Sequence, residues 1–347
     1  MKISLPDITL FLKIFGGISL LLVVLQGSME LKWSKEKNKT ILKMFLMCIL
    51  PMLTFSFLLA WFLNIKYETP FNTALINIIP FSIISSAIAI PAASLINDKN
   101  REEIVYESSF CDIIGIIFFD FVFQQRKNLF YQTEIFIAEL IGIIILTILA
   151  TVFIAWLLGF LKSKVRLIPI MAALVLVYEI AEYFALPGLI FIFVFGLFLG
   201  NMKKLSSIKF VSKIKPKQIS GNTEEFYHIV TEIGFLTRSI FFLILGFYIK
   251  VTELLNLKSL LISAAILLFI YLIRAIYLFL LKVEIIPNIF YAPRGLVTIL
   301  LFLYIPISFI MPQITISVVI QVVILSTLIM AVGPWIQNKN KPSVSEE

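Results

Sequence analysis

The chain has 347 residues, of which 60% are hydrophobic and 14% are charged, and its mean hydropathy is +1.01. Soluble globular domains carry about 25% charged residues, so this composition excludes a water-soluble enzyme. The net charge of +8 comes from basic residues in short segments between apolar stretches, a pattern of membrane-protein loops that argues against nucleic-acid binding.

Apolar segments long enough to cross a membrane follow one another along the chain. A spanning helix needs about 20 apolar residues to cross about 30 Å of hydrocarbon. The first segment carries Lys13 and no small-residue cleavage site, so we predict a span there rather than a signal peptide. We predict an all-α polytopic membrane protein, with one transmembrane domain over 1–335 and a short tail at 336–347. Eleven spans are expected, at roughly 7–26, 40–63, 74–95, 104–123, 133–160, 167–184, 187–200, 226–249, 255–281, 286–306 and 313–335.

Two of these segments contain residues that interrupt helices. The segment at 74–95 includes Pro80 and Pro91, and the segment at 286–306 includes three prolines and Gly295. Proline removes a backbone donor, and inside a bilayer the freed backbone groups must face protein or a watery cavity. Both segments are therefore predicted to be broken helices, with ordinary proline kinks as the alternative.

The broken segments occupy matching places in the chain. Each lies in the middle of a three-helix unit, the units being about 40–123 and 255–335, and an odd number of predicted spans separates them. The two units would therefore run through the membrane in opposite directions. Interrupted helices at corresponding places of two inverted halves are the best sequence indication of a transporter's substrate site.

The distribution of basic residues predicts the orientation. One set of alternate loops holds eighteen Lys and Arg residues and the other set holds five. Because cytoplasmic loops are enriched in Lys and Arg, we expect the C-terminus in the cytoplasm and the N-terminus outside.

Three ionisable side chains are expected at a similar depth within the membrane. Asp112 lies eight residues into its predicted segment, about 12 Å deep at 1.5 Å per helical residue, and Arg274 and Arg294 fall at a comparable level. Removal from water favours the neutral form of a carboxylic acid, so a carboxylate at this depth can exchange protons near neutral pH. The same carboxylate binds a cation such as Na+ only when deprotonated, and that competition is an exchange mechanism. The alternative is a buried aspartate neutralised by an arginine.

Glu107 lies closer to the cytoplasm than Asp112 on the same predicted helix. Arg274 or Arg294 can neutralise it, because a lone charge in the membrane is costly. We favour a structural pair of Glu107 with Arg274 over a role for Glu107 as a second transport carboxylate.

Several motifs together resemble those of the cation:proton antiporter superfamily, the Na+/H+ exchangers and their NhaP-type relatives. The segment YESSFCDIIGIIFF resembles the family's Glu-Ser-x-x-Asn-Asp motif, and LIRAIYLFLL followed by YAPRGLVTILLFLYIP resembles its late arginine helix and Arg-Gly motif. LLVVLQGSMELKW is similar to the family's third-span signature, and YEIAEYFALPGLIFIFVFGLFLGN to its aliphatic run ending in Gly-Asn. These motifs extend from about residue 18 to residue 335.

The resemblance implies roles for particular residues. Asp112 takes the place of the transport aspartate, which binds Na+ or K+ transiently, and Glu107, Arg274 and Arg294 take the places of its charge partners. Ser85, Ser86 and Cys111 are the expected auxiliary ligands at the broken helix and the motif. The implied fold has two inverted units with crossed, broken helices, which move against a dimerisation scaffold, here about 7–26 and 167–249, in an elevator-like cycle. A homodimer is expected.

The sequence departs from the family pattern in three places. Cys111 stands where the family has Asn or Asp before the transport aspartate, and its thiol is a poor substitute for an oxygen ligand of Na+. The family's Thr-Asp-Pro in the first broken helix is replaced here by Ala89, Ile90 and Pro91. The loss of these ligand side chains favours 1:1 electroneutral exchange, because the one remaining carboxylate is neutralised by one proton or one monovalent cation. The chain also begins at what resembles the family's third span, so we expect either an N-terminally short member or a gene whose true start lies further upstream.

Three functions fit these observations. The first is an antiporter that exchanges Na+ or K+ for H+ in an inner membrane, and the second is a transport-inactive scaffold or sensor with the same fold. The third is a channel-like cation or proton pathway. No enzyme activity and no cofactor are expected, since the sequence has no nucleotide-binding loop or Cys/His metal spacing, and both cysteines lie in apolar stretches as predicted free thiols.

Overall fold

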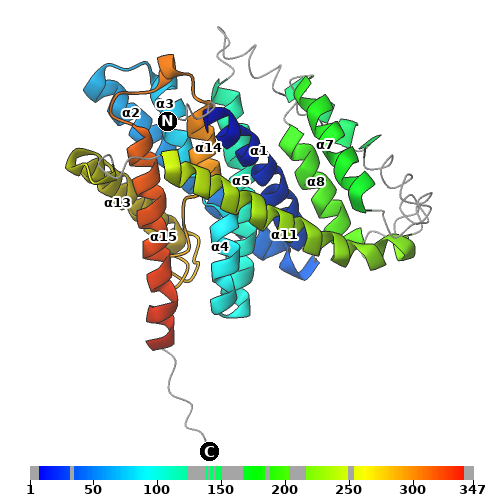
Figure 1. The fold of residues 1–347 in the computed structure, drawn as a ribbon. Helices are drawn as coiled ribbons and strands as arrows, with labels where there is room; N and C mark the ends of the chain where they lie inside the picture. Colours follow the sequence, from blue (N-terminus) through cyan, green and yellow to red (C-terminus); the bar gives the residue numbers. More distant parts are fainter. Residues whose placement is uncertain are drawn as a thin grey trace, which may run out of the picture. The chain divides into compact units, whose positions relative to one another are not determined.

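A computed structural model shows the fold of most of the chain (Figure 1). Most of the predicted segment at 133–160, the long loop after residue 202 and the end of the tail lie outside the described residues. The described residues are 8–31, 35–123, 137–138, 141–143, 145–147, 149–150, 167–183, 188–202, 216–248 and 254–339.

Within the described residues all regular secondary structure is helical, as the sequence predicts. Ten of the eleven predicted segments coincide with described α-helices, and one of them holds two, α3 and α4. The α-helices are α1 (Ile8–Glu30), α2 (Asn38–Tyr67), α3 (Phe71–Ser82), α4 (Ser86–Ala92), α5 (Asp98–Phe123), α7 (Leu167–Tyr183), α8 (Gly188–Gly200), α11 (Pro216–Tyr248), α13 (Leu257–Leu280), α14 (Leu296–Tyr304) and α15 (Ile316–Lys339).

Five described helical segments are long and apolar enough to cross a membrane by themselves. They are Asn38–Tyr67, Phe71–Leu95, Glu224–Phe247, Leu257–Leu280 and Ile316–Pro334. The segments Ile14–Glu30 and Gly188–Gly200 are apolar but shorter. The chain is therefore a multi-span, all-helical membrane protein, with five clear spans in its described part against the eleven expected for the whole.

The contacts divide the chain into two compact units. Unit 1 contains Met1–Gly17, Lys35–Val122 and Ile240–Glu347, and unit 2 contains Ile18–Ser34 and Phe123–Ser239. Helices α1 and α11 contribute residues to both units. The two predicted three-helix units fall almost entirely within unit 1.

The broken helices lie at the centre of unit 1. Every residue of α3 from Ala74 to Ser82 is buried, as is every residue of α14 from Leu296 to Phe302. A helix that is apolar and buried all round belongs to the interior of a bundle. Helix α3 packs against α2 and α14, and α15 packs against α13 and α14 (Figure 1). Helices α2, α13 and α15 expose large apolar side chains such as Trp61, Leu268 and Leu328, which suits a lipid-facing surface.

The first helix break falls between the two prolines rather than at either of them. Pro80 lies inside α3 and Pro91 inside α4, while the chain is non-helical over 83–85. The break forms there because tertiary contacts, described below, satisfy the backbone groups that it frees. Proline content alone predicted that the helix is broken but not where.

The second break is longer than the sequence suggested. The predicted span begins at residue 286, but α14 begins only at Leu296, and no α-helix covers 281–295. Pro287 and Pro293 lack backbone donors in this stretch, and the backbone N–H of Arg294 donates to Ser326 Oγ on α15 at 2.9 Å.

Unit 2 contains a close contact between α8 and the second half of α1. Gly196 and Gly200 lie one turn apart on α8, and a Cβ atom at Gly196 would approach the Leu25 carbonyl oxygen to 3.0 Å. At Gly200 a Cβ atom would overlap the backbone of Met29. Small residues spaced by four allow membrane helices to approach at their backbones. Asn201, at the end of α8, donates to the Leu31 carbonyl at 2.8 Å and anchors this pair.

Candidate functional site

Asp112 lies in the interior of unit 1, on α5, and is 1% exposed. Its Oδ2 atom accepts hydrogen bonds from the backbone N–H of Ser86, at 3.2 Å, and from the Ser86 hydroxyl. Ser86 is the first residue of α4, and the N–H groups of a first helical turn have no partner within their helix. Asp112 Oδ1 has no hydrogen-bond partner among the described residues. The break between α3 and α4 therefore fixes one oxygen of the carboxylate and leaves the other available.

The two helix breaks meet beside this carboxylate. The backbone N–H of Ser85, in the first break, donates to the carbonyl of Pro293, in the second, at 2.9 Å. The contact is close because Gly295 has no side chain: a Cβ atom there would lie 2.6 Å from Ser85 Oγ. The Ser85 hydroxyl is buried and has no partner within the described part of the chain. The two breaks are therefore in direct contact, and the contact includes a buried hydroxyl that has no partner among the described residues.

Arg294 stabilises the open end of α3. Its Nε atom donates to the Phe81 carbonyl at 2.8 Å and its Nη2 atom to the Ser82 carbonyl at 3.4 Å, while Nη1 donates to the Ala292 carbonyl at 2.5 Å. The last carbonyls of a helix lack intrahelical partners, and a cation at that end is favourable. We expected Arg294 to be a charge partner of a carboxylate. In the described structure its guanidinium instead binds carbonyl oxygens, because the break in α3 leaves those carbonyls without other donors.

Glu107 and Arg274 form a buried, bidentate ion pair. Arg274 Nη1 lies 2.5 Å from Glu107 Oε1, Nη2 lies 2.9 Å from Oε2, and both residues are 3% exposed. The Nε and Nη2 atoms of Arg274 also donate to the carbonyl of Asn288, at 3.1 and 2.7 Å. The partner choice favoured from the sequence is the one present in the structure. Because Asn288 belongs to the stretch before α14, the pair joins α5, α13 and the second break.

Two polar residues of this network were missed by the sequence analysis. Asn288 Nδ2 donates to Glu103 Oε2 at 3.0 Å, and Glu103 is 6% exposed. Glu103 lies four residues before Glu107, so both carboxylates fall on one face of α5, and that spacing was the available signal. Asn288 had no comparable signal, because its partners are distant in the sequence.

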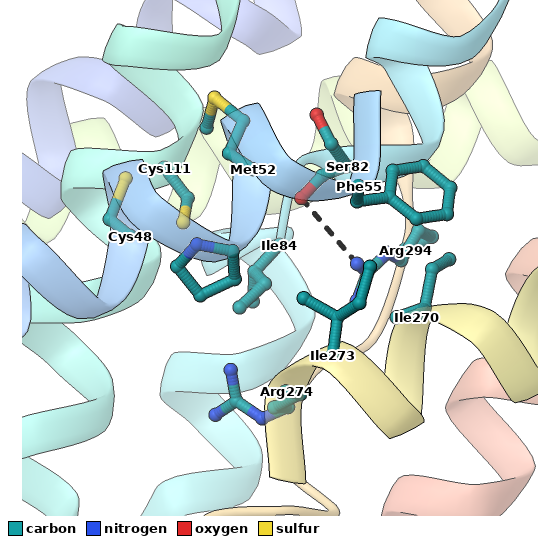
Figure 2. A pocket seen from close by; sticks show the side chains of 11 residues that line it. Cys48, Met52, Phe55, Ser82, Ile84, Cys111, Ile270, Ile273, Arg274 and Arg294 are labelled. Atoms are coloured by element: carbon teal, nitrogen blue, oxygen red, sulfur yellow. Dashed lines mark hydrogen bonds between the residues drawn. The ribbon is translucent and has the colours of Figure 1, made fainter. Parts of the chain in front are cut away.

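A small cavity lies between α2, α5, α13 and the two breaks (Figure 2). It has a volume of about 20 Å³, and Arg274 and Arg294 lie on its wall. Asp112, Ser85 and Ser86 are not among the lining residues, whereas Cys111 is. Lining side chains are Cys48, Pro51, Met52, Phe55, Ser82, Ile84, Cys111, Ile270, Ile273, Arg274 and Arg294.

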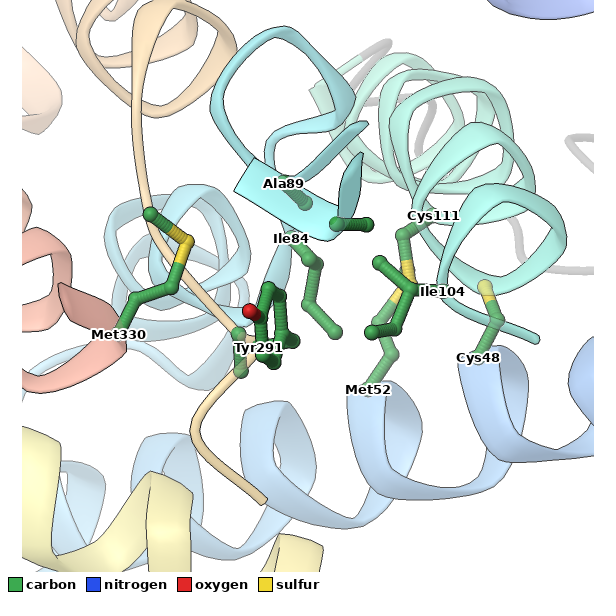
Figure 3. Close-up of a cluster of buried hydrophobic side chains, with 10 residues drawn as sticks. Cys48, Met52, Ile84, Ala89, Ile104, Cys111, Tyr291 and Met330 are labelled. Carbon is green, nitrogen blue, oxygen red and sulfur yellow. The ribbon is translucent and has the colours of Figure 1, made fainter. Parts of the chain in front are cut away.

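Cys111, the residue before Asp112, is 2% exposed. Cys111 and Cys48 belong to one cluster of buried side chains beside the two breaks (Figure 3). Of the three auxiliary ligands expected from the sequence, Ser86 is the one that hydrogen-bonds Asp112 in the described structure.

Buried ionisable side chains beside two interrupted helices are typical of one class of protein, the polytopic membrane transporters with discontinuous helices. Comparison with known families makes the assignment specific: residues 3–336 match the transmembrane sodium/hydrogen exchanger family. The chain therefore belongs to the sodium/hydrogen exchanger family, which is a family of transporters and not of enzymes.

Two solved structures of the sodium proton antiporter MjNhaP1 from Methanocaldococcus jannaschii have the same fold. The structure at pH 8 is 19% identical, with a TM-score of 0.65 over 97% of this chain and 93% of that chain. The electron-microscopy structure is 17% identical, with a TM-score of 0.68 over 97% of this chain and 88% of the other. No curated protein matches the sequence.

Proposed function

We propose that this protein exchanges a monovalent cation, Na+ or K+, for H+ on the carboxylate of Asp112. The proposal rests on the burial and the hydrogen bonding of that carboxylate. It is 1% exposed, Ser86 holds Oδ2 through two hydrogen bonds, and Oδ1 has no partner in the described part of the chain. An ionisable group in the membrane interior is costly and marks an ion path or a charge pair.

The chemistry of the cycle follows from competition for one oxygen. The protonated acid carries H+ on Oδ1 across the membrane, loses it on the other side and becomes a carboxylate. The carboxylate then binds one cation at Oδ1 and returns, so one proton is exchanged for one monovalent cation and no net charge moves. Ser86 keeps the carboxylate oriented in both states through Oδ2.

The ligands available for the cation are few. Ala89, Ile90 and Cys111 occupy positions where the family pattern has oxygen ligands, and none of them offers a hard side-chain donor. We propose that Ser85 Oγ, which is buried and without a partner in the described structure, supplements Asp112 and backbone carbonyls of the break. Glu107 and Arg274 stabilise the core as a neutral pair and do not carry the transported ion.

The remaining features are proposed from the resemblance and the loop charges. The units at about 40–123 and 255–335 form an inverted repeat that moves against a scaffold of about 7–26 and 167–249, and the protein is a homodimer in the inner membrane. The excess of basic residues in one set of loops supports a cytoplasmic C-terminus and an external N-terminus. A green fluorescent protein fused to the C-terminus would fluoresce only if that end is cytoplasmic.

A transport-inactive scaffold or sensor is the second candidate. The absence of oxygen donors at Ala89, Ile90 and Cys111 favours it, because a site with a single carboxylate and few neutral ligands binds hard cations weakly. This candidate predicts a folded membrane protein that moves no protons in response to any alkali cation.

Proton movement in inverted membrane vesicles tests the proposal. A pH gradient is established, Na+, K+, Li+ or choline is added, and recovery of a pH-sensitive dye reports exchange. The wild type should respond to at least one alkali cation and not to choline. Asp112→Asn, which keeps the shape of the side chain but cannot release a proton, should reduce the response to that of empty vesicles without lowering the amount of inserted protein. Asp98→Asn, at the exposed start of the same helix, is the matched control and should exchange normally.

The outcomes separate the two candidates. Full exchange by Asp112→Asn would remove Asp112 from the site. A folded wild type that responds to no cation would support the scaffold instead.

A further inference from the structure

Three sulfur-containing side chains meet at the cavity beside the two breaks. Cys48 on α2 and Cys111 on α5 are each 2% exposed, and both line this cavity. Met52, one turn after Cys48 on the same face of α2, is also 2% exposed and lines the same cavity (Figure 2). Figure 3 shows Cys48, Met52 and Cys111 together on one side of the buried cluster. These side chains have no assigned part in the exchange proposed above.

The donor set selects a class of ligand. Two thiols and a thioether are soft donors, which favour Cu+ and Ag+ over Na+, Mg2+ or Ca2+. Zinc prefers four ligands, usually Cys, His or carboxylate, and the described residues hold no cluster of three or more such side chains suited to a metal ion. Cys48 and Cys111 are the only cysteines of the chain. Two sulfur ligands with a third weaker one suit a soft monovalent ion of low coordination number.

The charge of the cavity wall complements the complex that would form. Binding of a monovalent ion M+ by two thiols gives [M(SR)2]− and releases two protons, so the bound complex is an anion. Arg274 and Arg294 both line the cavity. Glu107 already balances Arg274, whereas the guanidinium of Arg294 donates only to carbonyl oxygens and has no carboxylate partner among the described residues. An anionic bis-thiolate complex would offset that charge in a medium of low dielectric constant.

The size of the cavity also fits. A volume of about 20 Å³ holds about one water molecule, so it admits a single small ion and no larger ligand. When both thiols are protonated and no ion is bound, sulfur atoms and guanidinium groups line this space.

We propose that this cavity is a binding site for one soft monovalent cation, Cu+ or Ag+, held by the sulfur atoms of Cys48 and Cys111 with Met52 as a third ligand. The site is distinct from the oxygen site at Asp112. Binding can be measured on the purified protein whether or not it exchanges protons, so failure of the exchange proposal would not decide this one.

Titration of the full-length protein in detergent, under anaerobic and reducing conditions, tests the site. Ag+ is titrated calorimetrically, and Cu+ is supplied in competition with a chromophoric Cu+ chelator. We expect one ion per chain and release of two protons per ion, read from the dependence of the heat on buffer ionisation enthalpy. X-ray absorption of the bound metal should show sulfur neighbours only.

Matched variants locate the site. Cys48→Ser and Cys111→Ser should each abolish stoichiometric binding, and Met52→Leu should weaken it by about tenfold or more. Met47→Leu removes another buried methionine of α2 that does not line the cavity, and its affinity should equal that of the wild type. If the cysteine variants do not fold, the test is whether bound Ag+ protects the thiols of the wild-type protein from alkylation.

Several results would overturn the proposal. They are binding that persists in both cysteine variants, equal weakening by Met52→Leu and Met47→Leu, release of no protons, or oxygen neighbours in the absorption spectrum.

Discussion

Neutralising Glu107 should strongly destabilise this protein. In Glu107→Gln the guanidinium of Arg274 stays in the core without the carboxylate that lies 2.5 and 2.9 Å from its terminal nitrogens. Breaking a buried pair from one side costs about 3–5 kcal/mol. The bonds from Arg274 to the Asn288 carbonyl remain, so we expect a loss near the lower end, about 3 kcal/mol in the free energy of unfolding.

Two double variants separate the ion pair from its surroundings. Glu107→Gln combined with Arg274→Gln leaves no unpaired charge and should be more stable than either single variant by about 1–3 kcal/mol. The charge swap, Glu107→Arg with Arg274→Glu, should recover only part of the loss. A carboxylate at position 274 cannot donate to the carbonyl of Asn288, which would lose both of its donors.

The assay is thermal unfolding of the purified protein in detergent, followed by tryptophan fluorescence, with the yield of monodisperse protein as a second measure. Glu284→Gln is the control, because Glu284 pairs with Lys99 where both side chains are at least half exposed, at 50% and 66%. Exposed pairs contribute about 0–1 kcal/mol. If the neutral double variant is no more stable than the single variants, buried charge is not the cause of their instability and the reasoning fails.

Three further predictions concern the breaks and the loop before α14. Arg294→Gln should lower the free energy of unfolding by about 3 kcal/mol, because it leaves several buried carbonyls without donors. Arg294→Lys should recover only part of that loss, because one ammonium group cannot reproduce the guanidinium fork. A lysine variant that melts at the wild-type temperature would contradict this prediction. Gly295→Ala should lower folded yield and exchange, since its Cβ would collide with the other break, whereas Gly246→Ala, with nothing within 4 Å of the added atom, should be neutral in both assays. The hydrogen bond from Lys99 lowers the pKa of Glu284. The contribution of this pair to folding stability is therefore fully present above the ordinary pKa of glutamate, and it is lost as the pH falls through the lowered pKa of Glu284. Because the pair is exposed, melting curves of wild type and Glu284→Gln should differ only slightly near neutral pH and converge in acid; a gap that widens in acid would reverse this assignment.

The membrane class and the central residues were available from the sequence. Hydropathy is a local property, and a stretch of about 20 apolar residues has few stable placements other than across a bilayer. Asp112, Glu107 and Arg274 were noticeable because ionisable groups are rare in such stretches. The pairing of Glu107 with Arg274 was favoured because a lone charge in the membrane is costly, and the structure contains that pair.

Only the tertiary structure decided where the helices break and what the polar groups contact. The first break lies at 83–85, away from Pro80 and Pro91, because Pro293 accepts the N–H of Ser85 and Arg294 binds the carbonyls at the end of α3. These bonds join residues about two hundred positions apart, and no local pattern contains them. The same holds for Cys48 and Cys111, which line one cavity although they are distant in the sequence. A sequence shows which polar groups need partners inside a membrane, and the packing of distant segments decides which partners they find.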